Sequence, residues 1–233
     1  MALYFRKNLV HESDISCFIL IYLLGKKVYF KAIIDVKCRK LICRKRPAIC
    51  VWLCERSLWV KMDTIKILDK NGTFQLDDAE NTSGLYFPIA SETGLKSSIT
   101  PNLGGDAKIA QTSFLMEPVS IENLHNNRST RNFWCMVDGQ RPWSATGASA
   151  EAENDRDTEN QEDSTLTAGF LWQKVERTAK NGILESEITS FVPYNANVEL
   201  MIVKITNTSV RVQSMRAVAA IPIYGRSADN IRD

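Results

Sequence analysis

The stretch FLWQKVERTAKNGILESEITSFV, residues 170–192, decides the fold class of this chain. In its first half, neighbouring side chains at positions 170–175 alternate in character, as they do when they lie on opposite faces of a β-strand. Lys180-Asn-Gly182 then supplies residues that favour a turn, and residues 183–192 bring the chain back. The stretch therefore predicts two strands joined by a turn.

A second hairpin is predicted in residues 65–76. Ile65 and Ile67 alternate with polar neighbours, and the same alternation follows Asp69-Lys-Asn-Gly72. Asn-Gly accepts the positive φ angles of a type I′ turn, so this spacing predicts a tight hairpin of that type.

The same pattern continues along the rest of the second half. Residues 132–137 run into the turn residues Asp138-Gly139. Residues 198–205 and 210–223 are rich in Val and Ile, which strands prefer, and are predicted to pair around Asn207-Thr-Ser209. Because no segment in this half carries a long helical stripe, we predict an all-β fold.

Composition changes sharply near residue 61. Residues 1–60 hold twelve Lys and Arg against four Asp and Glu, whereas residues 61–233 hold seventeen against twenty-three. Five of the six cysteines but one of the eleven glycines precede residue 61. We therefore expect residues 1–61 to form a basic, Cys-rich and poorly structured extension, with Met62 as a natural start and residues 62–233 as the domain.

The extension offers little support for a membrane, export or nucleic-acid function. The apolar run Cys17–Leu24 has eight residues, fewer than the roughly 20 that a transmembrane helix needs. Glu12 and Asp14 interrupt the start of a secretory signal, and the basic cluster at residues 37–46 belongs to no recognisable nucleic-acid-binding module. A four-thiolate zinc site remains an alternative, although its spacing lacks paired Cys-x-x-Cys knuckles. Its ligands would be Cys38, Cys43, Cys50 and Cys54.

An acidic stretch interrupts the strands at residues 151–163. It contains seven carboxylates, and Arg156 is its single base. A charge run of this kind is usually solvated, so we predict a surface loop. A calcium loop is the functional alternative, but the oxygen donors lack the spacing and the central glycine of an EF-hand.

Eight motifs together resemble a known family. The block from residue 81 to residue 147 and two later segments are similar to the first part of glycoside phosphorylases of the cellobiose phosphorylase group, which is glycoside hydrolase family 94, formerly glycosyltransferase family 36. The motifs are Asn81-Thr-Ser-Gly-Leu-Tyr-Phe-Pro88, Ser97-Ser-Ile-Thr-Pro-Asn-Leu-Gly-Gly-Asp106, Phe114-Leu-Met-Glu-Pro-Val-Ser120, Asn123-Leu-His-Asn126, Arg131-Asn-Phe-Trp134, Pro142-Trp-Ser-Ala-Thr-Gly147, Ile188-Thr-Ser-Phe-Val-Pro193 and Ala220-Ile-Pro-Ile-Tyr-Gly-Arg-Ser-Ala-Asp-Asn-Ile-Arg-Asp233.

The resemblance implies a galactose-mutarotase-like supersandwich that is incomplete at its C-terminus. The family reaction is the inverting phosphorolysis of a β-glucoside, such as cellobiose or a β-gluco-oligosaccharide, with inorganic phosphate as co-substrate and no cofactor. Phosphate takes the place of water, so a general acid suffices. In the family this acid lies in a helical (α/α)6 barrel, to which no position here corresponds, so no catalytic residue is assigned. We expect the chain alone to be inactive.

Without catalytic residues, the sandwich can still contribute contacts to a carbohydrate. Sugar sites combine an aromatic face with planar polar groups in a cleft. The residues that fit this mixture are Arg128, Arg131, Asn132, Trp134 and Trp143. Structural roles are the alternative. For Trp134 we predict a place in the core rather than in a sugar site, because a buried Trp is common in sandwich packing. Arg128 and Arg131 could instead form ion pairs with carboxylates such as Glu117 or Glu122.

The remaining candidate side chains do not indicate a functional site. His125 is the single histidine of the domain, so a multi-histidine metal centre is excluded, and Cys135 is predicted to pack as a small apolar residue. Leu103-Gly-Gly-Asp106 is interpreted as a loop that needs positive φ rather than a phosphate-binding turn.

Two functions from different classes follow from these observations. The first is a carbohydrate-binding fragment of a phosphorylase; the alternative is a freestanding carbohydrate-binding or scaffold module that pairs with a separate catalytic barrel. We expect a cytoplasmic protein whose partners are β-glucosides, with a possible homodimer through the sandwich of the complete enzyme and with neither nucleic acid nor membrane. One cysteine within the domain gives no disulfide framework, in keeping with that compartment.

Overall fold

The computed structural model describes the backbone of residues 2–9, 13–24 and 27–38, and both backbone and side chains of residues 65–79, 85–110, 112–118 and 130–224. Within these ranges the chain is mostly strand, with one short helix, and every strand pairing is antiparallel. The all-β prediction is therefore confirmed.

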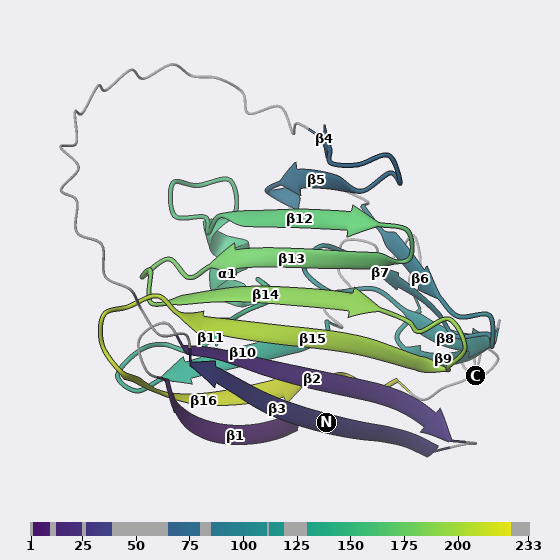
Figure 1. The fold of residues 1–233 in the computed structure, drawn as a ribbon, viewed down its shortest axis with the longest axis horizontal. Coiled ribbons are helices and arrows are strands. Elements are labelled where there is room, and N and C mark those ends of the chain that lie inside the picture. The colour runs from purple at the N-terminus through teal and green to yellow at the C-terminus, as the bar shows by residue number, and fades with distance from the viewer. Residues whose placement is uncertain are drawn as a thin grey trace.

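The described strands form one large and two smaller sheets (Figure 1). The large sheet contains, in spatial order, β3 (Lys27–Cys38), β2 (Ser13–Leu24), β15 (Val198–Asn207), β14 (Leu184–Phe191), β13 (Trp172–Thr178), β12 (Ser164–Gly169), β5 (Phe74–Asp77) and β4 (Lys66–Ile67). The second contains β1 (Ala2–Leu9), β16 (Gln213–Ala220), β10 (Asn132–Val137) and β11 (Trp143–Ser144). The third contains β6 (Phe87–Ala90), β7 (Lys96–Ile99), β8 (Ala107–Ala110) and β9 (Ser113–Met116). The helix is α1 (Ala150–Asp155).

The main core lies between the inner faces of these sheets. Alternate residues of β14 and β15, including Ile188 and Val203, share one buried cluster with Phe133 of β10 and Ala217 of β16. The third sheet contributes Ile99 to the same cluster. Burial alternates residue by residue along β12 to β15, as expected for strands with one face toward a core. A sandwich-like packing follows.

The two predicted hairpins form, but one turn differs from its prediction. β13 pairs with β14, and β4 with β5. In the second hairpin Gly72 has a φ of +82°, whereas Asn71 is not left-handed, so the predicted type I′ turn is wrong. Asp69 explains the difference, because its carboxylate accepts hydrogen bonds from the backbone N–H groups of Asn71 and Thr73 and closes a longer loop.

The predicted pairing of residues 198–205 with residues 210–223 is also wrong. β15 belongs to the large sheet and pairs with β14 and β2, whereas β16 belongs to the second sheet and pairs with β10 and β1. The turn between them therefore carries the chain from one sheet to the other. Turn residues mark a reversal of direction, but they do not specify whether the two strands share a sheet.

Three strands lie in the segment that the sequence predicted to be poorly structured. β2 pairs with β15 along its length, β3 pairs with β2, and β1 pairs with β16. A continuous apolar run such as Cys17–Leu24 does not by itself specify a strand, and here it becomes part of β2 by pairing along the edge of β15. The predicted domain boundary at residues 61 and 62 lies outside the described residues.

A chain that begins at Met62 tests whether this segment belongs to the sandwich. Removing residues 1–61 exposes the backbone N–H and C=O groups of β15 and β16, and exposed strand edges pair with other chains. We expect the shortened chain to self-associate in analytical ultracentrifugation and to unfold at lower urea concentration than the full chain. A shortened chain that stays monomeric and equally stable would show that the sandwich does not need these strands.

Candidate functional site

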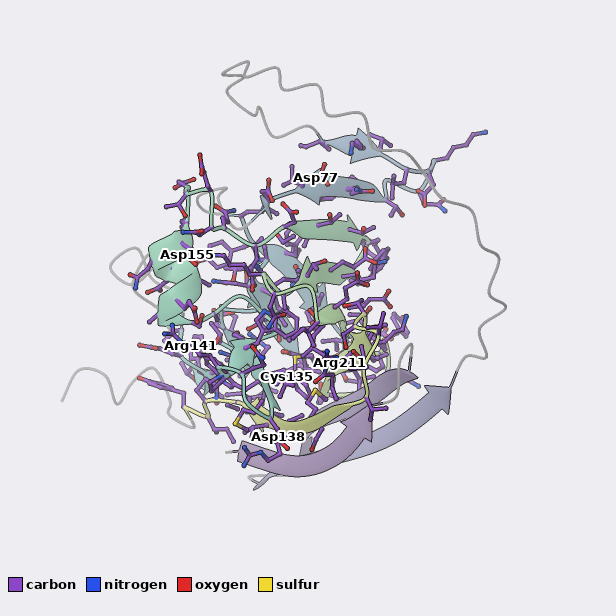
Figure 2. All side chains as sticks on the ribbon, turned by 90° about the vertical axis from the view of Figure 1, so that its left-hand side faces the viewer. Asp77, Cys135, Asp138, Arg141, Asp155 and Arg211 are labelled. Carbon is purple, nitrogen blue, oxygen red and sulfur yellow. The ribbon has the colours of Figure 1, made fainter. Side chains whose placement is uncertain are left out.

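A hollow of about 420 Å³ opens at one end of the sandwich. Its walls come from three stretches of chain, Gly139 to Ala152, Asp155 to Glu162 and Arg177 to Asn181, together with Asn102. Figure 2 shows two of its residues, Asp155 on α1 and Arg141 below it, on the same side of the molecule. Specific small-molecule sites are commonly concave and combine an apolar wall with a few polar groups, so this hollow is the candidate site.

Trp143 is the aromatic wall of the hollow, and a carboxylate fixes its orientation. Its indole Nε1–H donates to both oxygens of Glu162, at 2.9 Å to Oε1 and 3.1 Å to Oε2. The backbone N–H of Lys180 also donates to Oε1 of Glu162, at 3.1 Å. Glu162 thus joins β11, the acidic stretch and the turn after β13, and it holds the indole ring in place.

Arg177 brings a buried charge to the same hollow. It occupies an inward-facing position of β13, its side chain is 3% exposed, and its Nη1 lies 3.7 Å from Oε2 of Glu162. Gly147, at a φ of +73°, makes room for it, because a Cβ at this position would lie 2.3 Å from Nη2 of Arg177. The guanidinium therefore rests against the backbone of the turn that follows β11.

The acidic stretch is not wholly the surface loop that its charges predict. Ser149 caps α1 by accepting a hydrogen bond from the backbone N–H of Ala152 at 3.1 Å, and residues 150–155 are helical. Most of the carboxylates are exposed, as predicted, but Asp155 and Glu162 are half-buried and line the hollow. The stretch thus forms one wall of the candidate site.

Arg131, a predicted sugar ligand, lies in the interior with its side chain 0% exposed. It forms an ion pair with Glu199 of β15, whose carboxylate also accepts a hydrogen bond from Ser97. Its Nη1 and Nη2 donate to the backbone carbonyls of residues 103–106, at 3.0 to 3.4 Å. Its place is therefore structural. The ion-pair alternative predicted Glu117 or Glu122 as partner, whereas the partner is Glu199.

Asn132 supports the wall of the hollow without lining it. Its Oδ1 accepts hydrogen bonds from the hydroxyls of Ser144, at 2.8 Å, and Thr146, at 2.9 Å. Its Nδ2 donates to the carbonyl of Ala148 at 2.7 Å. These bonds fix the turn that contains Gly147, so Asn132 positions the residues on which Arg177 rests.

The two remaining predicted residues lie away from the site or outside the described residues. Trp134 is half-buried on β10 and is absent from the lining of the hollow. The prediction that Trp134 faces the core is wrong, because its neighbour Phe133 takes the inward position at 1% exposure. Arg128 lies outside the described residues, as does His125. Of the four predicted residues that the structure describes, Trp143 lines the hollow.

Cysteine chemistry adds little to this part of the molecule. Cys135 is 1% exposed within the main core, which confirms that it packs as an apolar residue, and burial raises the pKa of its thiol (Figure 2). Within the described ranges no group of three or more His, Cys, Asp and Glu side chains could hold a metal ion. The zinc alternative rests on cysteines whose side chains fall outside those ranges.

Sequence reasoning missed Glu162, Arg177 and Lys180. A signal for Arg177 was present, because it falls at an inward position of an alternating strand, where a charged side chain needs a specific partner. Glu162 carries no such signal, since it is one of seven carboxylates in its stretch. Among the residues with a described structure, no helix is long and apolar enough to cross a bilayer.

The buried ion pair can be tested by removing its partners singly and together. Arg131→Met or Glu199→Leu alone leaves a buried charge without its counterion, which costs about 3–5 kcal/mol of unfolding free energy. The double variant should lose less than the two single losses combined, yet stay below the wild type because the carbonyls of residues 103–106 lose their donors. Urea denaturation measures these losses, and additive losses would contradict a direct coupling.

The contact between Gly147 and Arg177 predicts a second difference in stability. Gly147→Ala forces the guanidinium to move, whereas Gly182→Ala, at a φ of +65° and with nothing within 4 Å of the new Cβ, carries the backbone cost alone. That backbone cost is roughly 1–2 kcal/mol. We expect a clearly larger loss of unfolding free energy for Gly147→Ala. Equal losses in urea denaturation would show that Arg177 does not need this close approach.

No protein-family model matches the chain, and no curated protein matches it either.

Proposed function

We propose that this chain is the carbohydrate-binding sandwich portion of an inverting glycoside phosphorylase of the cellobiose phosphorylase type, and that alone it does not catalyse phosphorolysis. Its ligands are β-glucosides, either a disaccharide such as cellobiose or a β-gluco-oligosaccharide. Within the proposal, the sheets are part of a galactose-mutarotase-like supersandwich, and the protein works in the cytoplasm. A homodimer through the sandwich belongs to the same proposal for the complete enzyme.

The observation that carries the proposal is the role of one family-like motif in the hollow. Pro142-Trp-Ser-Ala-Thr-Gly147 forms one wall, where Trp143 supplies an aromatic face and Gly147 gives Arg177 its place. An aromatic face beside a carboxylate and a guanidinium is the combination that a sugar ring needs, because its C–H surface is apolar and its hydroxyls both donate and accept hydrogen bonds.

A second motif of the resemblance supports the same wall from inside. Arg131-Asn-Phe-Trp134 begins β10, and Asn132 holds the turn after β11 through three hydrogen bonds. Residues from two of the family-like motifs thus form one structural unit beside the hollow.

Titration with cellobiose, cellotriose and cellotetraose tests the proposal. Saturable binding, followed by calorimetry and by tryptophan fluorescence, is expected for the full chain and should weaken by about tenfold in Trp143→Ala, since the apolar contact between the indole and the C–H face of the sugar is lost. Trp134→Ala, whose side chain does not line the hollow, is the matched control and should bind as the wild type does.

The same preparation should release no glucose 1-phosphate from these sugars in the presence of inorganic phosphate. Phosphorolysis by the chain alone would overturn the proposed division between a binding sandwich and a separate catalytic domain. Binding by a monodisperse protein that gains activity only when a helical barrel is added would favour the freestanding module. Absence of any binding would remove the carbohydrate proposal.

A further inference from the structure

Three side chains that meet in the hollow are held in place by contacts within its wall. Glu162 accepts hydrogen bonds from the indole of Trp143 and from the backbone of Lys180, and the guanidinium of Arg177 is confined by Gly147. These contacts fix the positions of the side chains before a ligand arrives, which lowers the entropy lost on binding. The hollow therefore presents three preorganised groups: the aromatic face of Trp143, the hydrogen-bond acceptor Glu162 and the hydrogen-bond donor Arg177.

The two charged groups are close enough for one ligand atom to reach both. Nη1 of Arg177 lies 3.7 Å from Oε2 of Glu162, which is beyond direct hydrogen-bond distance. A hydroxyl oxygen beside the pair, about 2.8 Å from each atom, can donate its proton to the carboxylate and accept a hydrogen bond from the guanidinium. Hydroxyls have both capacities, whereas an ionised carboxylate offers no proton to Glu162 and a phosphate monoester is mostly doubly ionised at neutral pH.

The charges that line the hollow are nearly balanced. Each of its carboxylates has a cationic side chain within 4.0 Å: Arg141 lies near Glu151, Lys180 near Asp155 and Arg177 near Glu162. The remaining cation of the lining, Arg156, is exposed to solvent, where its field is screened. An anionic ligand would gain little from such a lining and would have to approach three carboxylates.

We propose that the hollow binds one uncharged pyranose unit, with its C–H face on Trp143 and one hydroxyl bridging Oε2 of Glu162 and Nη1 of Arg177. The inference rests on the proposed carbohydrate function and adds the groups that recognise one sugar unit. Glu162 has two parts in this site: it positions the indole of Trp143 and accepts the bridging hydroxyl.

The experiment combines protein variants with deoxy sugars. The probes are methyl β-glucoside, its 2-, 3-, 4- and 6-deoxy forms and glucose 1-phosphate, each titrated by calorimetry at low and high salt. Glu162→Gln keeps an oxygen for the indole N–H of Trp143 but removes the charge, and a lost charge-assisted hydrogen bond is expected to weaken glucoside binding by about tenfold. For one deoxy form, whose missing hydroxyl is the bridge, Glu162→Gln should change the affinity little.

Glu159→Gln is the matched control, since Glu159 is an exposed carboxylate of the same acidic stretch and is absent from the lining. It should leave every affinity unchanged, and high salt should leave glucoside binding unchanged. Urea denaturation of each variant separates loss of binding from loss of folding.

Each failure has its own meaning. Sugars that bind equally well to the wild type, Glu162→Gln and Trp143→Ala would overturn this site while leaving the carbohydrate function standing. Tighter, salt-sensitive binding of glucose 1-phosphate would overturn the choice of an uncharged ligand. If neither methyl β-glucoside nor any of the cello-oligosaccharides binds, the proposed function fails, and this inference fails with it.

Discussion

The buried ion pair between Arg131 and Glu199 is the interaction on which the architecture depends most. It joins residues 68 positions apart in the sequence and links the start of β10 to β15. Burying two charges is costly unless their hydrogen-bonding groups are satisfied, and here Ser97 and the carbonyls of residues 103–106 complete the set. The loop before β8, the second sheet and the large sheet are thereby held in one mutual arrangement.

From this pair a series of contacts leads to the candidate site. Arg131 is followed directly by Asn132, whose hydrogen bonds fix the turn after β11. That turn contains Gly147, which receives the guanidinium of Arg177, and Arg177 lies beside Glu162. Glu162 in turn orients Trp143. The positions of the side chains in the hollow thus depend, through these contacts, on the ion pair in the core, although neither residue of the ion pair lines the hollow.

Local patterns in the sequence predicted local structure well and long-range structure poorly. The hairpin of β13 and β14 follows from alternation and turn residues, which act over a few positions. The partners of β15 and β16 depend on which sheet each strand joins, and the turn between them carries no such information. The strands before residue 39 escape prediction for the same reason, because β2 forms on the edge of β15 and β1 on the edge of β16, and both partners are distant in the sequence.

The candidate site shows the same division. Trp143 follows from the rule that sugar sites combine an aromatic face with planar polar groups, and Asn132 follows from the same rule for its amide, although its part is structural. Arg131 is a predicted sugar ligand because of its charge, yet its ion-pair partner is the carboxylate of Glu199 on a distant strand. Glu162 and Arg177 gain their importance from each other and from Trp143, which are contacts that spacing along the chain does not encode.

The strand order of the large sheet also bears on how the chain can be assembled during synthesis. β5 pairs with β12, and Asp77 meets Thr165 across 88 positions of sequence. A ribosome releases the chain from its N-terminus, so β5 leaves the exit tunnel long before its neighbour exists. β4 can pair with β5 at once, but until β12 follows, the other edge of β5 and its apolar side around Leu76 stay uncovered. The hairpin of β4 and β5 therefore joins the large sheet late, after most of the chain has been made.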